Sequence, residues 1–197
     1  MIECVLWDFG DTLADESWMI KAPAELPVWP DIYKRHIWDG SLGINWNLGR
    51  VGSDRVASDL AGLLSADVGY ITGFMKRRCA DVTFFGHAMD AVNSCELVQA
   101  IVTINPDIFS QEVVPNYKLN EVFEIIVTSW EEENLDKSDL CDIAIQKLGS
   151  VSDRSRALLI DNRIENVEGW QARGGKAYHF TGDAAFAANL PDIFEVF

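Results

Sequence analysis

Four polar residues, far apart in the sequence, stand at or just beyond the ends of apolar runs: Asp8, Thr103, Lys137 and Asp161. An aspartate can act as a nucleophile toward an electrophile such as phosphorus and form a covalent intermediate. A threonine hydroxyl can hold the oxygens of that group, and a lysine can balance the negative charge. The carboxylates of Asp8 and Asp161 would supply the hard oxygen ligands that Mg²⁺ prefers. This set of residue types is therefore typical of metal-assisted displacement through an aspartyl intermediate.

This chemistry requires the four residues to meet, and the pattern of the chain predicts that they do. From about residue 86 onward, apolar runs alternate with helical patterns, which indicates βαβ units and a parallel sheet. The expected strands are 2–7, 98–104, 124–128, 157–160 and 177–180, and the expected helices are 107–117, 138–148 and 163–173. Asp107 is expected to cap the first of these helices and Gly149 to end the second. Because the carboxyl ends of parallel strands lie on one edge of a sheet, the four polar residues are expected to converge there.

The segment 15–85 has a different character and predicts a small helical insertion after the first strand. It holds three of the six prolines and four of the seven tryptophans, and it shows no convincing strand. Helical patterns cover 54–64 and 66–79, with Ser53 and Ser65 at the expected N-cap positions. The tryptophans are expected to form the core of this module. The alternative is that some of them line a pocket that faces the strand ends.

The composition limits the classes of function. The net charge of −15 argues against a nucleic-acid partner, whose phosphates require basic patches. No run approaches the roughly 18 apolar residues that span a membrane, and no basic stretch followed by an apolar core opens the chain, so a cytoplasmic protein without a membrane partner is expected. The four cysteines are widely spaced, which favours reduced thiols over a zinc site.

The motifs that carry the chemistry resemble those of the haloacid dehalogenase-like (HAD) hydrolase superfamily. The matching segments, in order, are Asp8-Phe9-Gly10-Asp11-Thr12-Leu13, Val102-Thr103, Lys137, and Leu159-Ile160-Asp161-Asn162 with Glu165 and Asn166. The resemblance covers 1–14 and 86–197, which would form the core domain, and 15–85 sits where the helical cap of the first type belongs. It implies an α/β fold with a Rossmann-like three-layer core. It also implies a Mg²⁺-dependent phosphatase or a related hydrolase, with an aspartyl-phosphate intermediate on Asp8.

The resemblance also implies the roles of individual residues. Mg²⁺ would be held by Asp8, the main-chain carbonyl of Gly10 and Asp161, with Glu165 as a further ligand or an outer-shell carboxylate. Thr103, the backbone N–H of Ile104 and Lys137 would bind the phosphate. Asn166 would orient a ligand rather than act as one.

The chain departs from the family pattern at Gly10. Phosphatases of this family usually carry there, two residues after the nucleophile, an aspartate that protonates the leaving oxygen and then activates water. Three interpretations follow. Asp11 takes over that role, bulk water or a cap residue serves instead, or the protein has lost most activity and keeps only ligand binding. For Asp11 itself, a role in the turn is the alternative to a catalytic one. A second departure is Ile104, which separates Thr103 from Asn105, so Asn105 is not expected at its usual place.

Three functions remain open from the sequence. The first is a Mg²⁺-dependent phosphatase of a small phosphorylated metabolite. The second is a metal-independent 2-haloacid dehalogenase, for which Gly10 is acceptable but which would need a cap arginine, with Arg35, Arg50 and Arg55 as candidates. The third is a non-catalytic binding protein on the same scaffold. A homodimer is also left open, because the tryptophan-rich segment could pack against a second copy of the chain.

Overall fold

Five short apolar segments form one parallel sheet at the centre of the protein. The structure, a computed structural model, describes residues 1–196. The strands are β1 (Cys4–Trp7), β2 (Val98–Thr103), β3 (Ile125–Thr128), β4 (Ala157–Asp161) and β5 (Lys176–His179), in the spatial order β3-β2-β1-β4-β5. The predicted parallel α/β sheet is thereby confirmed. Its five strands match the five expected apolar runs to within about two residues at each end.

The register of the sheet brings the chemical residues together. The central strand β1 pairs with β2 and β4, and Trp7 lies opposite both Ile101 and Ile160. Asp8, one residue before Thr103 in this alignment, therefore leaves the sheet beside the ends of β2 and β4. The backbone N–H of Asp8 still donates to the carbonyl of Ile160 at 2.9 Å, so the first residue of the loop is held by the sheet.

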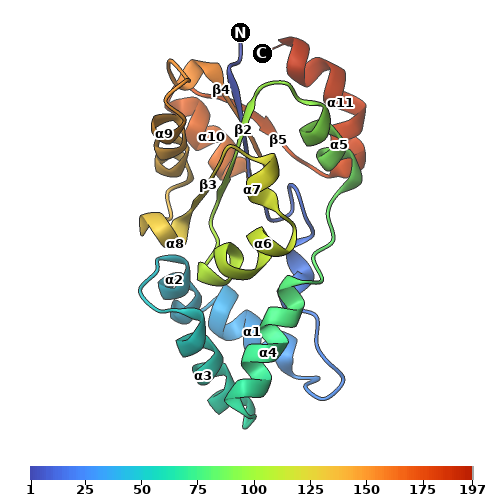
Figure 1. Ribbon diagram of the computed structural model, residues 1–197, viewed down its shortest axis with the longest axis vertical. Coiled ribbons are helices and arrows are strands. Elements are labelled where there is room, and N and C mark those ends of the chain that lie inside the picture. Colours follow the sequence, from blue (N-terminus) through green and yellow to red (C-terminus); the bar gives the residue numbers. More distant parts are fainter. Residues whose placement is uncertain (197) are drawn as a thin grey trace.

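Helices cover both faces of the sheet, as a three-layer α/β fold requires (Figure 1). On one face, helices α9 (Lys137–Leu148) and α10 (Ile164–Ala172) pack Leu140, Ala144 and Trp170 against the strands. On the other face lie α5 (Gly86–Ser94), α11 (Asp183–Val196) and the short elements η3 (Phe109–Val113), α6 (Val114–Asn116) and α7 (Leu119–Val122). The turns α8 (Ser129–Glu132) and η4 (Arg154–Arg156) complete the connections. Gly149 ends α9 with φ of 65°, as predicted.

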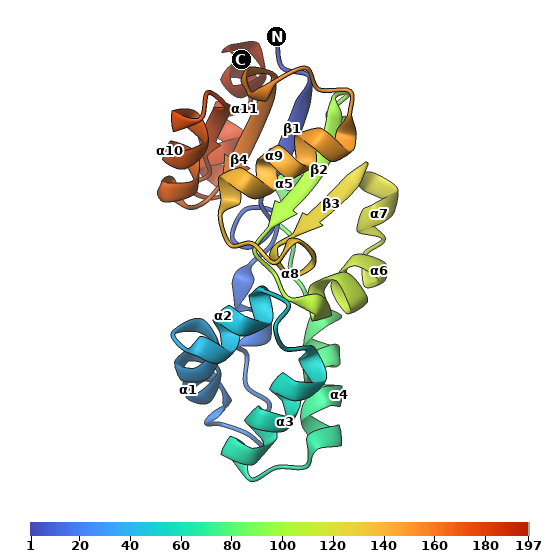
Figure 2. The same ribbon diagram turned by 90° about the vertical axis from the view of Figure 1, so that its left-hand side faces the viewer.

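The helices of the segment between β1 and α5 form a separate group beyond the carboxyl ends of the strands (Figure 2). They are η1 (Glu16–Met19), α1 (Trp29–Tyr33), the π-helical η2 (Lys34–Trp38), α2 (Ser41–Asn47), α3 (Ser53–Leu64) and α4 (Val68–Cys79). We refer to this group as the helical cap. Trp18, Trp29 and Trp46 are buried, whereas Trp38 is 47% exposed. The tryptophans therefore divide between the two predicted roles, since Trp38 lines the cavity described below.

Three local predictions need correction. Gly52, not Ser53, precedes the first turn of α3, and Ser65 ends that helix in a left-handed conformation. Asp67 caps α4 instead, where its carboxylate accepts from the N–H of Tyr70 at 2.9 Å. The segment 107–117 is not one regular α-helix, because a π-helical turn at Phe109–Val113 interrupts it. Within the described residues no helix is long and apolar enough to cross a membrane, and all four cysteines are free thiols.

Candidate active site

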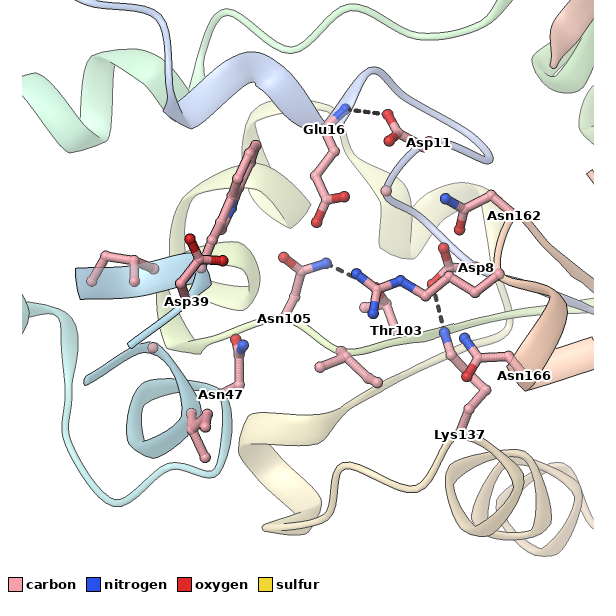
Figure 3. A pocket seen from close by; sticks show the side chains of 17 residues that line it. Asp8, Asp11, Glu16, Asp39, Asn47, Thr103, Asn105, Lys137, Asn162 and Asn166 are labelled. Carbon is pink, nitrogen blue, oxygen red and sulfur yellow. Dashed lines mark hydrogen bonds and ion pairs between the residues drawn. The ribbon is translucent and has the colours of Figure 1, made fainter. Parts of the chain in front are cut away.

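A cavity of about 510 Å³ opens between the carboxyl edge of the sheet and the helical cap (Figure 3). Its core side is formed by residues that follow the strands: Asp8, Gly10, Asp11, Thr103, Ile104, Asn105, Lys137, Asn162, Arg163 and Asn166. Its other side is formed by Glu16, Ile37, Trp38, Asp39, Gly43, Ile44 and Asn47. Residues separated by more than 150 positions thus line one space, which is the arrangement that ligand sites adopt at the edge of open α/β sheets.

The ammonium group of Lys137 links the two aspartates that the sequence singled out. Its Nζ lies 2.5 Å from Oδ1 of Asp8 and 3.3 Å from Oδ2 of Asp161, and it donates to the carbonyl oxygen of Val102 at 2.8 Å. The side chain of Lys137 is 2% exposed and that of Asp161 is 0% exposed. Lys137 holds this place as the first residue of α9, whose N-terminus is capped by Asp136. One buried cation therefore serves two carboxylates.

This cluster is short of positive charge. The pKa of Asp8 is raised to about 6, because burial, the largest effect, together with the neighbouring Asp161 outweighs the lowering effect of Lys137. Burial alone would lower the pKa of Lys137, but the carboxylates of Asp8 and Asp161 outweigh it and raise that pKa, so the ammonium form persists. An additional cation beside these carboxylates would offset the remaining negative charge.

Asp161 is held in a single orientation by the start of α10. Its Oδ1 accepts from the N–H of Arg163 at 2.8 Å, and the Nδ2 of Asn166 lies 3.0 Å from both carboxylate oxygens. The orienting contact expected of Asn166 is therefore present. Because these donors come from the N-cap residue and the first turn of α10, the position of the carboxylate depends on this local segment rather than on the helical cap.

Thr103 lies at the end of β2 and is buried, and its hydroxyl oxygen accepts from Nδ2 of Asn105 at 2.8 Å. The hydroxyl proton of Thr103 is consequently available for another acceptor. Asn105 lines the cavity despite the intervening Ile104, so its contribution was missed by the comparison with the family motif. The main-chain carbonyl of Asn105 is held by the hydroxyl of Ser129 at 3.3 Å.

Asp11 supports the turn that follows Asp8. Its φ is 52°, in the left-handed region that aspartate tolerates better than most residues. Its Oδ1 accepts from the N–H of Glu16 at 2.9 Å, and the side chain is exposed at the margin of the cavity. These contacts match the turn role; a catalytic role for Asp11 stays a prediction.

Glu165 does not reach the cavity, which corrects its expected place near a metal ion. It lies in the first turn of α10 and is exposed, because the next residue, Asn166, occupies the face of the helix that points to Asp161. Across residues 1–196 no group of three histidine, cysteine, aspartate or glutamate side chains forms a cation site. Asp8, the carbonyl of Gly10 and Asp161 stay predicted metal ligands; Asp8 and Gly10 line the cavity, whereas Asp161 is fully buried beside Lys137.

Three charged residues of the cavity were not expected from the sequence, namely Arg163, Glu16 and Asp39. Arg163, directly after Asn162, supplies a second cation besides Lys137. Glu16 is half buried, and burial, followed by the nearby Asp11 and Asp8, raises its pKa. Glu16 is the first residue of η1, the element that begins the helical cap. This segment shows no sequence motif, so only the folded structure reveals the residue.

Asp107 joins the core to the helical cap. Its buried carboxylate accepts from Nε1 of Trp46 at 2.6 Å, from the backbone N–H of Ser53 at 2.9 Å and from the Ser53 hydroxyl. It also accepts from its own neighbour, the N–H of Ile108, at 2.9 Å. The expected cap of its own helix is therefore only part of what Asp107 does, since it also caps α3 from a distant position in the sequence.

We expect Asp107→Asn to lower the free energy of unfolding by about 1–3 kcal/mol, because the new amide group must face a backbone or indole N–H that the carboxylate accepted. Urea denaturation followed by tryptophan fluorescence would measure the change. Asp90→Asn, an exposed position on α5, is the matched control and should change stability by less than about 0.5 kcal/mol. Equal stability of Asp107→Asn and the wild type would contradict this role.

Comparison with known proteins gives a consistent structural result. No protein-family model matches the chain, and no curated protein matches it in sequence. Among solved structures, the chain is similar to a predicted HAD-like family hydrolase from Porphyromonas gingivalis, with a TM-score of 0.75, 16% identity and coverage of 100% of this chain and 98% of that chain.

Two further structures are similar at lower scores. One is L-2-haloacid dehalogenase from Xanthobacter autotrophicus with chloropropionic acid covalently bound, with a TM-score of 0.69, 18% identity and coverage of 98% of this chain and 83% of that one. The other is HAD family enzyme bt-2542 from Bacteroides thetaiotaomicron in complex with magnesium and inorganic phosphate, with a TM-score of 0.66, 14% identity and coverage of 91% and 94%. At these identities the similarity establishes the fold.

Proposed function

From the haloacid dehalogenase-like fold with a helical cap, which this chain has, we propose that it is a Mg²⁺-dependent phosphatase. It would hydrolyse a small phosphorylated compound through an aspartyl-phosphate intermediate on Asp8. The observation that carries the proposal is the buried ammonium group of Lys137 between the carboxylates of Asp8 and Asp161. Asp8 and Lys137 line the cavity and Asp161 is fully buried beside Lys137, which supports the proposed roles of nucleophile, charge-balancing cation and metal-type carboxylate.

The charges that line the cavity support a divalent cation as part of the site. Four carboxyl groups line it or reach into it, those of Asp8, Asp11, Glu16 and Asp39, against the two cations Lys137 and Arg163. A phosphate group would be repelled by this excess of negative charge. The oxygens of Asp8, Asp161 and the Gly10 carbonyl are the hard donors that Mg²⁺ accepts, and Mg²⁺ commonly uses only one or two carboxylates and fills its shell with water and phosphate. When bound, the ion would neutralise the charge that develops on the phosphoryl oxygens.

In the proposed reaction, side chains of the protein attack phosphorus, balance charge and bind the phosphoryl oxygens. A carboxylate oxygen of Asp8 attacks phosphorus, the bond to the leaving oxygen breaks, and the phosphoryl group is carried on Asp8 until water releases it. The ammonium group of Lys137 keeps Asp8 in place and offsets negative charge. The hydroxyl of Thr103, already fixed by Asn105, donates to a phosphoryl oxygen, and the N–H of Ile104 is the second donor proposed for it.

The structure also bears on the dehalogenase alternative. The similarity to an L-2-haloacid dehalogenase supports a common fold, but Arg35, Arg50 and Arg55, the candidates to hold the substrate carboxylate, do not line the cavity. Arg55 instead pairs with Asp59 on the surface of α3. The carboxylates of Asp39 and Glu16 would repel the carboxylate of a haloacid, because a metal-independent dehalogenase has no metal ion to offset their negative charge. The phosphatase is therefore the function that we propose.

The test is hydrolysis by the purified chain with Mg²⁺ and with a chelator. An aryl phosphate and a panel of small phosphate esters would be compared with 2-chloropropionate. We expect release of phosphate from the esters that requires Mg²⁺, and no release of halide from 2-chloropropionate. Halide release without metal would establish the dehalogenase instead, and neither activity in a folded protein would favour a binding role.

The contact between Asn166 and Asp161 leads to a prediction about the metal. Asn166→Ala removes the amide that holds both carboxylate oxygens, so we expect the Mg²⁺ concentration for half-maximal activity to rise by about 10–100-fold. Titration of activity with Mg²⁺ at saturating substrate would measure this. Asn93→Ala, at an exposed position of α5, serves as the control. An unchanged Mg²⁺ requirement in Asn166→Ala would contradict a role of this contact in metal binding.

A further inference from the structure

We propose that Glu16 protonates the leaving oxygen and then activates the attacking water, in place of the side chain that Gly10 lacks. This inference rests on the proposed phosphatase function and assigns one of its steps to a residue outside the family motifs. Glu16 lies eight residues after the nucleophile, in the short helical turn η1 (Glu16–Met19) that enters the cap.

The end of the Glu16 side chain lies directly beside Gly10, where a side chain at position 10 would be. A Cβ atom added to Gly10 would lie 3.2 Å from Cδ, 3.4 Å from Cγ and 3.4 Å from Oε1 of Glu16, and these are its three nearest heavy atoms apart from the adjoining residues. The φ angle of Gly10 is outside the left-handed region, so its backbone would accept a side chain. The end of the Glu16 side chain therefore occupies the place that a carboxyl group at position 10 would otherwise take.

The backbone of Glu16 is well anchored, which a positioned catalytic group requires. Its N–H donates to Asp11 at 2.9 Å. The preceding Asp15 donates its N–H to the carbonyl of Thr83 at 2.9 Å, and its carboxylate accepts from the N–H of Ser17 at 2.8 Å. Asp11 thus acts as a positioning residue for Glu16, because its carboxylate accepts from the backbone N–H of Glu16.

The direction of the Glu16 side chain fits the role. Figure 3 shows its carboxyl group pointing into the cavity, toward the amide of Asn105 and the space in front of Asp8. The other unassigned carboxyl group, that of Asp39, lies on the cap side of the cavity, across from Asp8. Glu16 is therefore the carboxyl group best placed to meet an oxygen that leaves phosphorus opposite Asp8.

The proposed steps balance in atoms and charge. As the Asp8 oxygen bonds to phosphorus and the ester P–O bond breaks, the Glu16 carboxyl group gives its proton to the departing alkoxide, which leaves as an alcohol. The Glu16 carboxylate then takes a proton from water as the water oxygen bonds to phosphorus. The bond between Asp8 and phosphorus breaks, inorganic phosphate leaves, and both carboxyl groups return to their starting states. Such proton transfer typically contributes about 10²–10⁴ in rate.

The test compares Glu16→Gln with the wild type on two esters, one with a weakly basic nitrophenolate leaving group and one with an alkyl leaving group. Nitrophenolate needs no proton to leave, so the variant should release about one equivalent in a rapid burst and then turn over about 10²–10⁴-fold more slowly than the wild type. The alkyl ester needs proton transfer both when its leaving oxygen departs and when water attacks. Its turnover should therefore fall by the same factor, without a burst. Glu25→Gln, an exposed cap residue, is the control and should behave as the wild type.

An independent check is to place a carboxyl group at position 10, where phosphatases of this fold usually carry an aspartate. Glu16→Ala vacates the space beside residue 10, so Gly10→Asp in that background should raise turnover of the alkyl ester at least about tenfold over Glu16→Ala alone. Glu16→Gln activity within about threefold of the wild type on both esters would overturn the proposal. Equal loss on both esters without a burst, and no rescue by Gly10→Asp, would also overturn it. If the wild type shows no hydrolysis that depends on Asp8, the proposed function fails and this inference fails with it.

Discussion

Asp8→Asn is expected to reduce phosphate ester hydrolysis by at least about 10⁴-fold, the scale of loss when a covalent nucleophile is removed. The amide has nearly the shape of the carboxylate but cannot attack phosphorus to form the acyl phosphate. The fold should survive, because Lys137 keeps its contacts with Asp161 and with the carbonyl of Val102. Steady-state kinetics with an aryl phosphate and Mg²⁺, together with a thermal melt, would test both statements.

The appropriate control for this variant is Asp31→Asn. Asp31 is an exposed residue in the first turn of α1, on the cap and outside the cavity. It carries the same change of charge and should leave turnover within about twofold of the wild type. Residual activity of Asp8→Asn above a tenth of the wild-type value would mean that another group attacks the substrate.

Lys137→Met is expected to damage both stability and activity. The substitution leaves Asp8 and Asp161 facing each other in a buried site without the cation that lies 2.5 Å from one and 3.3 Å from the other. Removal of one partner from a buried ion pair typically costs about 3–5 kcal/mol, because the remaining charge is uncompensated. Activity should fall by at least about 10³-fold, since the nucleophile loses its position and the phosphate loses a counter-charge.

A matched control lies on the same helix. Lys147, near the end of α9, pairs with Glu132 on the surface, and its side chain is 46% exposed. Lys147→Met should lower the free energy of unfolding by less than about 1 kcal/mol, as surface ion pairs do. Urea denaturation of both variants would give the two values. Similar values for Lys137→Met and Lys147→Met would show that the buried cluster does not carry the charges that we assign to it.

The sheet was predictable because its signals are local. Each strand is a short, mainly apolar run, with β1 and β4 fully buried, and the helices that follow have one apolar side, so element type and order follow from the pattern. The same reasoning placed Asp8, Thr103 and Asp161 at one edge, where the structure has them. Gly149 also behaves as a local C-cap signal predicts. The predicted serine caps were wrong for two different reasons. At α4, Asp67 lies two residues after Ser65 and accepts from the N–H of Tyr70. At α3, the N–H of Ser53 is bound by the distant carboxylate of Asp107.

The parts of the site that were missed depend on contacts distant in the sequence. Asp107 looks like a helix cap, but its main partners are Trp46 and Ser53 of the helical cap. Glu16 becomes meaningful only when it is seen to fill the space beside Gly10. Glu165 and Asn166 are adjacent in the sequence, and only the rotation of α10 decides which of them meets Asp161. Residue type alone could not separate these cases.

The most direct test of the phosphatase mechanism is to trap the intermediate on Asp8. The protein would be mixed with Mg²⁺ and a phosphate-labelled ester, quenched in acid within the first turnover, and the labelled peptide identified by mass spectrometry. We expect one phosphate per chain on the peptide that contains Asp8, lost on treatment with hydroxylamine and absent in Asp8→Asn. A phosphate on any other residue, or hydrolysis without a labelled chain, would contradict it.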